Sequence, residues 1–469
     1  MLKLIEELRQ EANLKLNPKN KGPLGQFMTP YPIAQFMASL FTNKQKVKLL
    51  DGGAGIGSLS IACSEVLNIE KIEVWEIDPV MLSYLETNFS KLNITNEIHN
   101  KDFILDSVER IKANVKPSFT NAILNPPYKK INQNSDHRLA CREVGIESVN
   151  LYICFFALAI RQMVEGGEIV IIIPRSFCNG AYYKPFREFL LNECSIDFIH
   201  SFVSRNNAFK DDEVLQENVI FKATRGKKQG VVVISQSHDG TFKDIESREV
   251  PFETIVKPSD KELYIHIPTD DVAESEILFD KSLKELGIEV STGPVVDFRC
   301  KEYWSFEPIE NTAPLLYPNH FTKEGFRFPV VFKKPNSLIR CPEVDKWLMK
   351  AGDYVLVKRF SAKEERRRVV AYLITKDKLN YEMFGFENHW NVFHIKKNGL
   401  TRNLALGLTC FLNSTVLDDY FRVFSGHTQV NATDLKNMKY PNLENLEKLG
   451  KQFSEKMTQE QIDNLVMGL

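Results

Sequence analysis

No run of apolar residues in this sequence is long enough to cross a membrane, and no two cysteines have the C-x-x-C spacing of a metal or redox site. The eight cysteines are scattered, which argues against a zinc site and against a disulfide framework. The first residues are amphipathic and carry acids, without the apolar centre of a signal peptide. From these absences we expect a protein of the reducing cytoplasm with no membrane partner.

A surplus of charge is also missing, since 60 Lys and Arg residues against 61 Asp and Glu residues give a formal net charge of -1. The total charge therefore does not mark a nucleic-acid-binding protein, and any attraction to DNA must come from a local basic face. A hydrophobic content of 43% in 469 residues is typical of a globular protein with two domains.

The hydrophobic pattern alternates between strand-like and helix-like segments over the first half of the chain. This alternation predicts an α/β fold with a doubly wound, mostly parallel sheet. The expected helices are 33–41, 59–67, 81–92 and 150–163. The expected strands are 47–51, 71–76, 121–124, 168–173 and 231–235, with 198–203 and 218–221 as an edge hairpin.

A change of pattern near residue 245 divides the chain into two expected domains. Residues 1–245, opened by a docking helix over 1–16, would contain the sheet. Residues 246–469 contain shorter strand-like pieces and loops and close with a helix over 443–466, which predicts a mixed α+β domain.

The stretch Asn125-Pro126-Pro127-Tyr128 follows a predicted strand and ends it abruptly, because two prolines remove two backbone donors. Ligands of open α/β sheets bind at such strand ends. The Asn125 side-chain oxygen and the Pro126 carbonyl could accept hydrogen bonds from the exocyclic amine of a base, and Tyr128 could stack on that base. Methylation of the amine would suit this arrangement, and a plain turn is the other interpretation.

The predicted strand 47–51 runs into the glycine loop 52–57 and then into a helix, which brings backbone amides close to a ligand. The G-x-G-x-G spacing differs from the dinucleotide fingerprint, and Glu76 ends the next strand, where an acid can accept hydrogen bonds from ribose. S-adenosylmethionine, a nucleoside cofactor without a pyrophosphate, fits both features, and its cationic groups would favour Asp51 nearby. An NAD-binding fold is the alternative.

Two shorter features complete the first domain. Thr29 is a suitable N-cap for the helix over 33–41. Asp102 and Phe103, after a weak third strand, could hold the cofactor adenine by its amino group and its face. An acid followed by an apolar residue is common, so this pair carries little weight alone.

Six segments, taken in order, resemble the gamma-class DNA amino-methyltransferases of prokaryotic restriction–modification systems, chiefly adenine-N6 enzymes. The resemblance covers about residues 20–222, and the ordered set is far more specific than any one member. The segments are GQFMTP (25–30), LLDGGAGIGSL (49–59), VWEIDP (74–79), KDF (101–103), ILNPPY (123–128) and EGGEIVIIIP (165–174).

This resemblance implies S-adenosylmethionine as cofactor, a flipped adenine in double-stranded DNA as the target, and a cognate restriction endonuclease as functional partner. The implied catalytic residues are Asn125, Pro126, Pro127 and Tyr128. The implied cofactor contacts are Phe27, Thr29, Asp51, Gly53, Gly55, Glu76, Ile77, Asp102, Phe103 and Pro127. Phe209 would be the second stacking face for the base, with core packing as its alternative role. Gly52 departs from the proline that relatives often have, which makes the loop looser.

The second domain contains two polar stretches that could contact DNA. Cations at 358–359 and 366–368 would suit phosphates, and the stretch 424–435 is rich in side chains able to read base edges. The expected DNA contacts are Lys358, Arg359, Arg366, Arg367, Arg368, His427, Gln429 and Asn431. A solvated charged face and a polar loop with a helix cap are the alternatives.

Together these features predict a site-specific adenine-N6 DNA methyltransferase, with a Rossmann-like S-adenosylmethionine-dependent methyltransferase domain and a C-terminal DNA-recognition domain. We expect a monomer of the prokaryotic cytoplasm with no metal requirement. No P-D-(D/E)-x-K nuclease motif is found, which favours a stand-alone methylase.

Cytosine-N4 methylation is chemically close, but Asn rather than Ser at position 125 favours adenine. RNA base and protein glutamine methyltransferases share the clamp but usually lack a large C-terminal region. An intact cofactor set disfavours a catalytically silent DNA-binding module.

Overall fold

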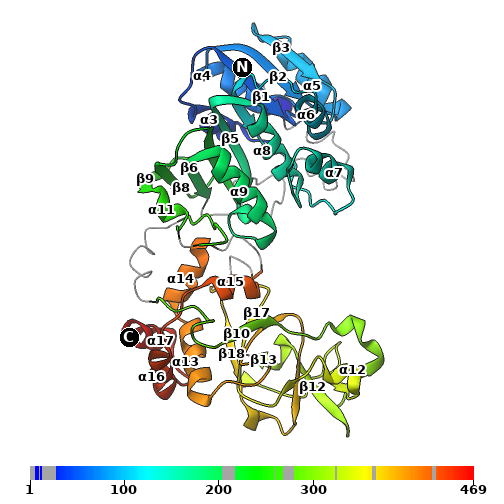
Figure 1. Ribbon diagram of the computed structural model, residues 1–469, viewed down its shortest axis with the longest axis vertical. Coiled ribbons are helices and arrows are strands. Elements are labelled where there is room, and N and C mark those ends of the chain that lie inside the picture. Colours follow the sequence, from blue (N-terminus) through cyan, green and yellow to red (C-terminus); the bar gives the residue numbers. More distant parts are fainter. Residues whose placement is uncertain are drawn as a thin grey trace. The chain divides into compact units, whose positions relative to one another are not determined.

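The computed structural model describes residues 6–9, 11–12, 28–202, 217–258, 260–267, 279–322, 325–361, 366–424 and 429–469 (Figure 1). The chain forms two compact units, Met1–Ile267 and Pro268–Leu469. The division lies after the residue 245 expected from the sequence, because β9 (Glu246–Pro251) pairs with β8 (Val231–Ser237) and so belongs to the first unit.

The first unit contains one nine-stranded sheet of order β3-β2-β1-β4-β5-β7-β6-β8-β9. Its pairs are parallel except where β7 meets β5 and β6, and where β9 meets β8, so the predicted mostly parallel sheet is confirmed. The remaining strands are β1 (Val47–Gly52), β2 (Ile69–Trp75), β3 (Thr95–His99), β4 (Phe119–Leu124), β5 (Met163–Pro174), β6 (Cys194–Phe202) and β7 (Asn218–Arg225).

The expected edge hairpin is wrong in one respect. β6 and β7 pair antiparallel as predicted, but they lie inside the sheet, since β8 adds parallel to β6 and β9 then forms the edge. The pairing of β8 involves residues far from β6 in sequence, and no local turn signal announces it.

Helices cover both faces of the sheet, which is the doubly wound arrangement. Alternate strand residues supply the two cores: Leu50 and Leu124 pack in one cluster, and Leu49 and Ile123 pack in the other. The first cluster includes residues of α6 (Phe103–Lys112), α7 (Asp136–Glu143), α8 (Leu151–Gln162) and α9 (Lys184–Glu193). The second includes residues of α3 (Tyr31–Ser39), α4 (Ser58–Val66) and α5 (Pro79–Phe89).

Parallel register brings the carboxyl ends of β1, β2 and β3 to one edge of the sheet. Gly52 pairs with Trp75, and Trp75 pairs with His99, so the segments that follow these residues leave the sheet together. β4, on the other side of β1, ends at Leu124 immediately before Asn125. This edge is where an open α/β sheet binds its ligands.

The second unit is a mixed α+β domain, as predicted. One sheet has the order β10-β20-β17-β18 and another has the order β11-β15-β12-β19-β16. The strands of the first are β10 (Glu289–Thr292), β20 (Trp390–His394), β17 (Tyr354–Lys358) and β18 (Ala371–Ile374). Those of the second are β11 (Trp304–Ser305), β15 (Ser337–Ile339), β12 (Thr312–Leu316), β19 (Met383–Phe386) and β16 (Met349–Lys350).

The single closing helix expected over 443–466 is two helices, α16 (Leu443–Gln452) and α17 (Gln459–Met467). The break is explained by a second N-terminus, where the Thr458 side chain accepts the Gln461 N–H and the Gln461 side chain accepts the Thr458 N–H. α16 packs on α13 (Arg402–Leu412) at two glycines. A Cβ on Gly407 would lie 1.7 Å from the Leu446 carbonyl oxygen, and one on Gly450 would lie 1.8 Å from that of Asn403.

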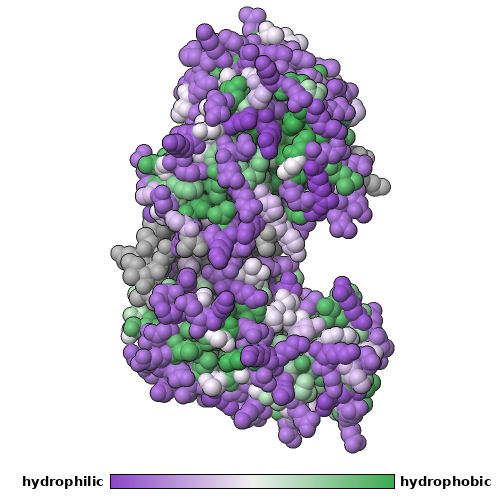
Figure 2. Space-filling view, in the orientation of Figure 1, coloured by the Kyte–Doolittle hydropathy of each residue, from purple (hydrophilic) through white to green (hydrophobic). Residues whose placement is uncertain are grey.

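Hydrophilic side chains cover most of the face shown in Figure 2, with smaller hydrophobic patches between them. Among the described residues, none of the helices combines the length and the apolar character needed to span a bilayer.

The glycine contact between α13 and α16 gives a stability prediction. Gly to Ala in an exposed helix usually stabilises by about 0.5–1 kcal/mol, but Gly450→Ala must push two helix backbones apart. We expect it to lower the free energy of unfolding by about 3 kcal/mol or more in urea denaturation. Glu447→Ala, at an exposed position of the same helix, is the control and should have little effect. Equal stability of the two variants would contradict the packing described.

Candidate functional site

A cavity of about 340 Å³ opens at the sheet edge where the strands end. This volume suits a small organic ligand. Its walls come from the glycine loop after β1, the end of β2, the start of α6, the segment after β4, and α8. The residues that line it include Met28, Thr29, Gly53, Gly55, Trp75, Glu76, Ile77, Asp102, Phe103, Asn125, Pro127, Ser135, His137 and Phe155.

The glycine loop is fixed by its neighbours on both sides. The N–H groups of Gly53 and Ala54 donate to the Trp75 carbonyl at 2.9 and 3.0 Å, which joins the loop to the end of β2. Gly53 and Gly55 have φ of 71° and 58°, values that favour glycine. A Cβ on Gly52 would lie 2.9 Å from the Phe103 ring, so a close contact accounts for glycine here.

Glu76 joins this loop to the turn after β2. Its Oε2 accepts the Gly55 N–H at 2.8 Å, and its Oε1 accepts the N–H groups of Ile77 and Asp78, each at 2.8 Å. Burial raises the pKa of Glu76, and the three amide donors oppose that rise. A carboxylate offers about four acceptor positions, so Oε2 retains capacity for one more donor from a ligand in the cavity.

Asp51 lies beneath the loop and does not line the cavity. It is fully buried; its Oδ2 accepts the Ser60 hydroxyl at 2.7 Å, and its Oδ1 has no hydrogen-bond partner in the described part of the chain. Burial, together with the negative charge of Glu76, raises the pKa of Asp51 to about 7. The expected direct contact with a bound cofactor is therefore not what the structure places here; Asp51 anchors α4 and can act on a ligand through its charge.

Asp102 and Phe103 begin α6 rather than ending a strand. The Asp102 carboxylate is the N-cap, where Oδ1 accepts the Leu105 N–H at 3.0 Å, and Oδ2 lies 2.9 Å from Nε2 of His137. Phe103 stacks on Phe155 with ring centroids 4.9 Å apart. The sequence indicated the first pair, but the roles of His137 and Phe155 were missed, because both come from helices after β4.

The segment after β4 contributes Asn125 and Pro127 to the cavity wall, whereas Pro126 and Tyr128 lie behind that wall. Asn125 Nδ2 donates to Thr29 Oγ1 at 2.9 Å, and the Tyr128 hydroxyl lies 3.0 Å from Asn125 Oδ1 and 3.2 Å from the Ile172 carbonyl. These contacts orient the Asn125 amide. Pro126 is buried, Pro127 lines the cavity, and burial raises the pKa of Tyr128. The predicted cap role of Thr29 is wrong, because Pro30 caps α3.

In the second unit, the basic cluster is only partly at the surface. Arg368 is 1% exposed, its Nε donates to Ser361 Oγ at 3.2 Å, and its guanidinium lies 5.7 Å from the Phe421 ring centre. The expectation that Arg368 contacts DNA is wrong, because its charge is enclosed in the core. Arg367 is half-buried and donates to the Asn413 carbonyl, whereas Arg366 is exposed.

The other predicted DNA contacts are partly engaged within the unit. Arg359 Nη1 donates to the Asn388 carbonyl at 2.8 Å, and Lys358 Nζ lies 5.3 Å from the Tyr372 ring centre. Gln429 forms an isolated antiparallel β-bridge with Phe360. Asn431 is the N-cap residue of α15 (Ala432–Asn437), which agrees with the helix-cap interpretation of this stretch. Phe27, Phe209 and His427 lie outside the described residues.

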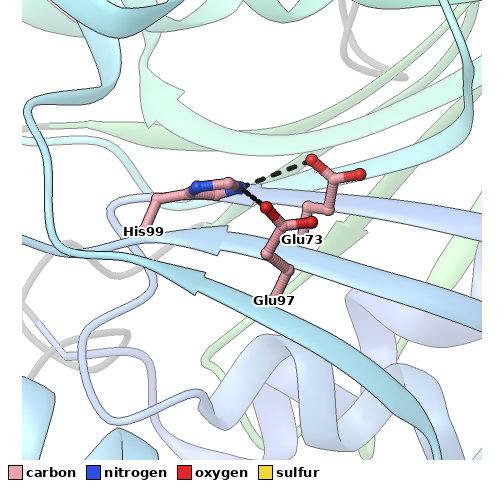
Figure 3. A group of neighbouring side chains, drawn as sticks. All are labelled: Glu73, Glu97 and His99. Carbon is pink, nitrogen blue, oxygen red and sulfur yellow. Dashed lines mark hydrogen bonds and ion pairs between the residues drawn. The ribbon is translucent and has the colours of Figure 1, made fainter.

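A separate group on β2 and β3 has the composition of a metal site. The carboxylates of Glu73 and Glu97 lie 3.4 and 3.6 Å from His99 Nε2 (Figure 3). Lys71 Nζ lies 2.7 Å from both carboxylates, and Arg110 lies 3.5 Å from Glu73. Two cations already balance the acids, so we interpret the group as an ion-pair network.

Comparison with known proteins identifies the class. The chain is similar to the type II methyltransferase M.BsuBI of Bacillus subtilis, 50% identical over 95% of this chain and 94% of that protein. It is also similar to M.PstI of Providencia stuartii, 41% identical over 99% of this chain and 96% of that protein. Residues 56–209 match the Eco57I restriction-modification methylase family.

Solved structures show the same fold across both units. The type IIL restriction-modification enzyme MmeI, solved in complex with DNA, gives a TM-score of 0.56 at 13% identity over 97% of this chain and 77% of that one. The doubly wound, mostly parallel sheet predicted for a Rossmann-like methyltransferase is confirmed. Among such methyltransferases, this chain belongs to the type II DNA methyltransferases of restriction–modification systems.

The raised pKa of Asp51 gives a pH-dependent prediction. The pKa of Asp51 rises from its ordinary value of 3.8 to about 7 in the folded protein. At a pH between these two values the native carboxyl holds a proton that the unfolded chain releases, so the parent loses stability as the pH rises through this range. Asp51→Asn cannot ionise and avoids that loss. The free energy of unfolding of Asp51→Asn, minus that of the parent, should therefore rise by about 2–3 kcal/mol between pH 5 and pH 8. Urea denaturation measures both values. A difference that is constant with pH would contradict the assignment.

Proposed function

We propose that this protein methylates N6 of adenine at a specific DNA sequence, with S-adenosylmethionine as methyl donor, and so protects host DNA from a cognate restriction endonuclease. The observation that carries the proposal is the position of Asn125-Pro126-Pro127-Tyr128 at the end of β4. Asn125 and Pro127 line the same cavity as the glycine loop, so an acceptor for an amine lies beside a site for a nucleoside.

The residues of the cavity fit the proposed donor. Glycines at 53 and 55 leave space along the loop, and the remaining acceptor position of Glu76 suits one ribose hydroxyl. The stacked rings of Phe103 and Phe155 offer an apolar wall for a purine, next to the Asp102 carboxylate that can accept from its amino group. When bound, the donor supplies an electrophilic methyl group on a sulfonium, and the buried Asp51 carboxyl supplies negative charge nearby at pH values above its raised pKa.

Asn125 would hold the target amine. Its Nδ2 donates to Thr29 Oγ1, which turns the amide so that Oδ1 is the acceptor atom of the pair, and the Tyr128 hydroxyl lies 3.0 Å from that oxygen. The Pro126 carbonyl is the second proposed acceptor, and Tyr128 the stacking face. Taking the adenine out of the duplex costs a few kcal/mol, roughly. Positioning supplies most of the catalysis, and the methylated amine loses its proton afterwards.

The second unit would recognise the target sequence. The exposed Arg366 is its best-placed phosphate contact among the predicted cluster, because Arg368 is buried and Arg367 and Arg359 donate to backbone carbonyls. Gln429 and Asn431 lie near the surface and are proposed base contacts, with Lys358 as a further phosphate contact.

Asn125→Ala tests the proposed chemistry. It should lower methyl transfer by about 100-fold or more, the scale of losing a hydrogen-bonding group that acts in the transition state, while duplex binding stays near the parent value. Asn134→Ala, an exposed neighbour outside the cavity wall, should methylate like the parent. Base-modification sequencing of the DNA then identifies the product. Transfer by the Asn125 variant at the parent rate, or modified cytosine as the product, would overturn the proposal.

Arg366→Ala tests the proposed DNA contact. Removing one phosphate contact should weaken binding to all sequences alike and lower the slope of log affinity against log salt by about 1. Arg368→Ala should instead lower the stability of the protein, since its guanidinium is buried against Phe421. Fluorescence anisotropy over a salt series measures the first effect and thermal denaturation the second. An unchanged salt slope for Arg366→Ala removes this residue from the interface.

A further inference from the structure

His137 lines the proposed nucleoside cavity, although it was not among the residues that the sequence indicated. It lies in the first turn of α7, which follows the segment after β4, and its side chain is one-third exposed at the cavity wall. Its Nε2 lies 2.9 Å from Oδ2 of Asp102, a residue 35 positions earlier in the chain. This contact therefore joins α7 to the N-terminus of α6 at the cavity wall.

The contact adds a second restraint to a carboxylate that already accepts hydrogen bonds from backbone N–H groups at the start of α6. Asp102 Oδ1 accepts the Leu105 N–H at 3.0 Å, which fixes one oxygen, and His137 fixes the other. Asp102 is about one-quarter exposed, so without the imidazole its carboxylate could turn toward water. Rotation about the bond that joins the carboxyl group to the chain would then change the acceptor direction that a ligand in the cavity meets.

The helix that carries His137 is also anchored by contacts that do not involve the imidazole. Arg138 and Arg142 both pair with Glu147, at 2.5 and 2.6 Å, and Lys112 of α6 pairs with Glu143 at 2.5 Å. The Ser135 side chain caps the helix. These contacts hold α7 whatever the state of the imidazole, so the effect of His137 on Asp102 can be separated from the folding of α7.

We propose that His137 is a positioning residue for the donor site, which holds Asp102 in the direction that receives the amino group of the donor's adenine. This inference rests on the proposed function for the identity of the donor. His137 touches Asp102 rather than the reacting atoms, so its removal should weaken donor binding and leave the chemical step little changed.

The charges around the imidazole make its contribution depend on pH. Asp102 raises the pKa of His137 above its ordinary value, with smaller effects in the same direction from Cys154 of α8 and Asp136 of α7, and partial burial opposes them. His137 in turn lowers the pKa of Asp102. As pH falls through the pKa of His137, the neutral hydrogen bond becomes an ion pair, and Asp102 is held more firmly.

The test measures binding of S-adenosylhomocysteine to the full-length protein by calorimetry, without DNA, between pH 6 and pH 8.5. This probe has the donor's nucleoside but no sulfonium, which limits the influence of Asp51. His137→Ala should raise the Kd about tenfold, because it removes a hydrogen bond to a charged group. His137→Gln places an amide N–H roughly where Nε2 lies, and should bind like the parent at pH 8.5 and several-fold more weakly at pH 6.

The Kd of His137→Gln divided by that of the parent isolates the effect of imidazole protonation on binding. The effects of the other titrating groups are the same in both proteins and cancel in this ratio. The control is Arg142→Ala, which loosens an exposed anchor of α7 and leaves Glu147 paired with Arg138; its Kd should stay within about twofold of the parent. With methyl transfer measured at saturating donor, His137→Ala should retain most of the parent's kcat.

Two results would overturn the inference while the proposed function stands: a pH-independent ratio for His137→Gln, or equal weakening by His137→Ala and Arg142→Ala. A parent protein that binds no S-adenosylhomocysteine at any pH would overturn the inference together with the proposed donor. Normal donor binding with no methylation of DNA would instead count against the proposed target alone.

Discussion

One buried carboxylate holds the two loops that form the floor of the cavity. Glu76 accepts an N–H from the glycine loop and two more from the turn after β2, at 2.8 Å each. The loop also donates to the Trp75 carbonyl, so the ends of β1 and β2 cannot move apart without losing several hydrogen bonds in a buried setting. The floor is thus organised before a ligand arrives, which lowers the ordering that binding requires. The same loop also positions one wall of the cavity, because the Phe103 ring packs against Gly52 in the space that a side chain there would occupy.

The same region keeps features that lower stability. Asp51 is fully buried with one oxygen unpartnered among the described residues, and its pKa is raised to about 7. An unpaired buried acceptor is unfavourable for folding, and sites that bind charged ligands often retain such groups. Asn125 shows the complementary case, because its amide is oriented by Thr29 and Tyr128 and the acceptor remains directed. The Asp51 carboxyl and the oriented Asn125 amide lie at the same edge of the sheet, an arrangement consistent with a methyl donor that binds beside an amine.

The second unit shows that residue type alone does not decide exposure. Three consecutive arginines read as one basic patch, yet Arg366 is exposed, Arg367 is half-buried and Arg368 is enclosed. The Asp418 carboxylate explains the difference: it accepts the backbone N–H groups of Arg368 and Val369 at 2.6 and 2.8 Å, which draws this segment into the core. Asp418 lies about 50 residues further along the chain, so no local pattern reveals it.

The sequence by itself determined the parallel strands β1, β2, β4 and β5, their carboxyl ends and the position of the two motifs along them, because strands and helices follow local periodicity and prolines and glycines end them. The glycine loop and the segment from Asn125 to Tyr128 therefore lie on the predicted edge. Tertiary structure alone decided which groups those motifs meet. Thr29 accepts a hydrogen bond from Asn125 instead of capping α3, Asp51 accepts one from Ser60 of α4, and His137 contacts Asp102. Such pairs are set by the packing of segments distant in the chain, and hydrogen bonding between them leaves no periodic trace in the sequence.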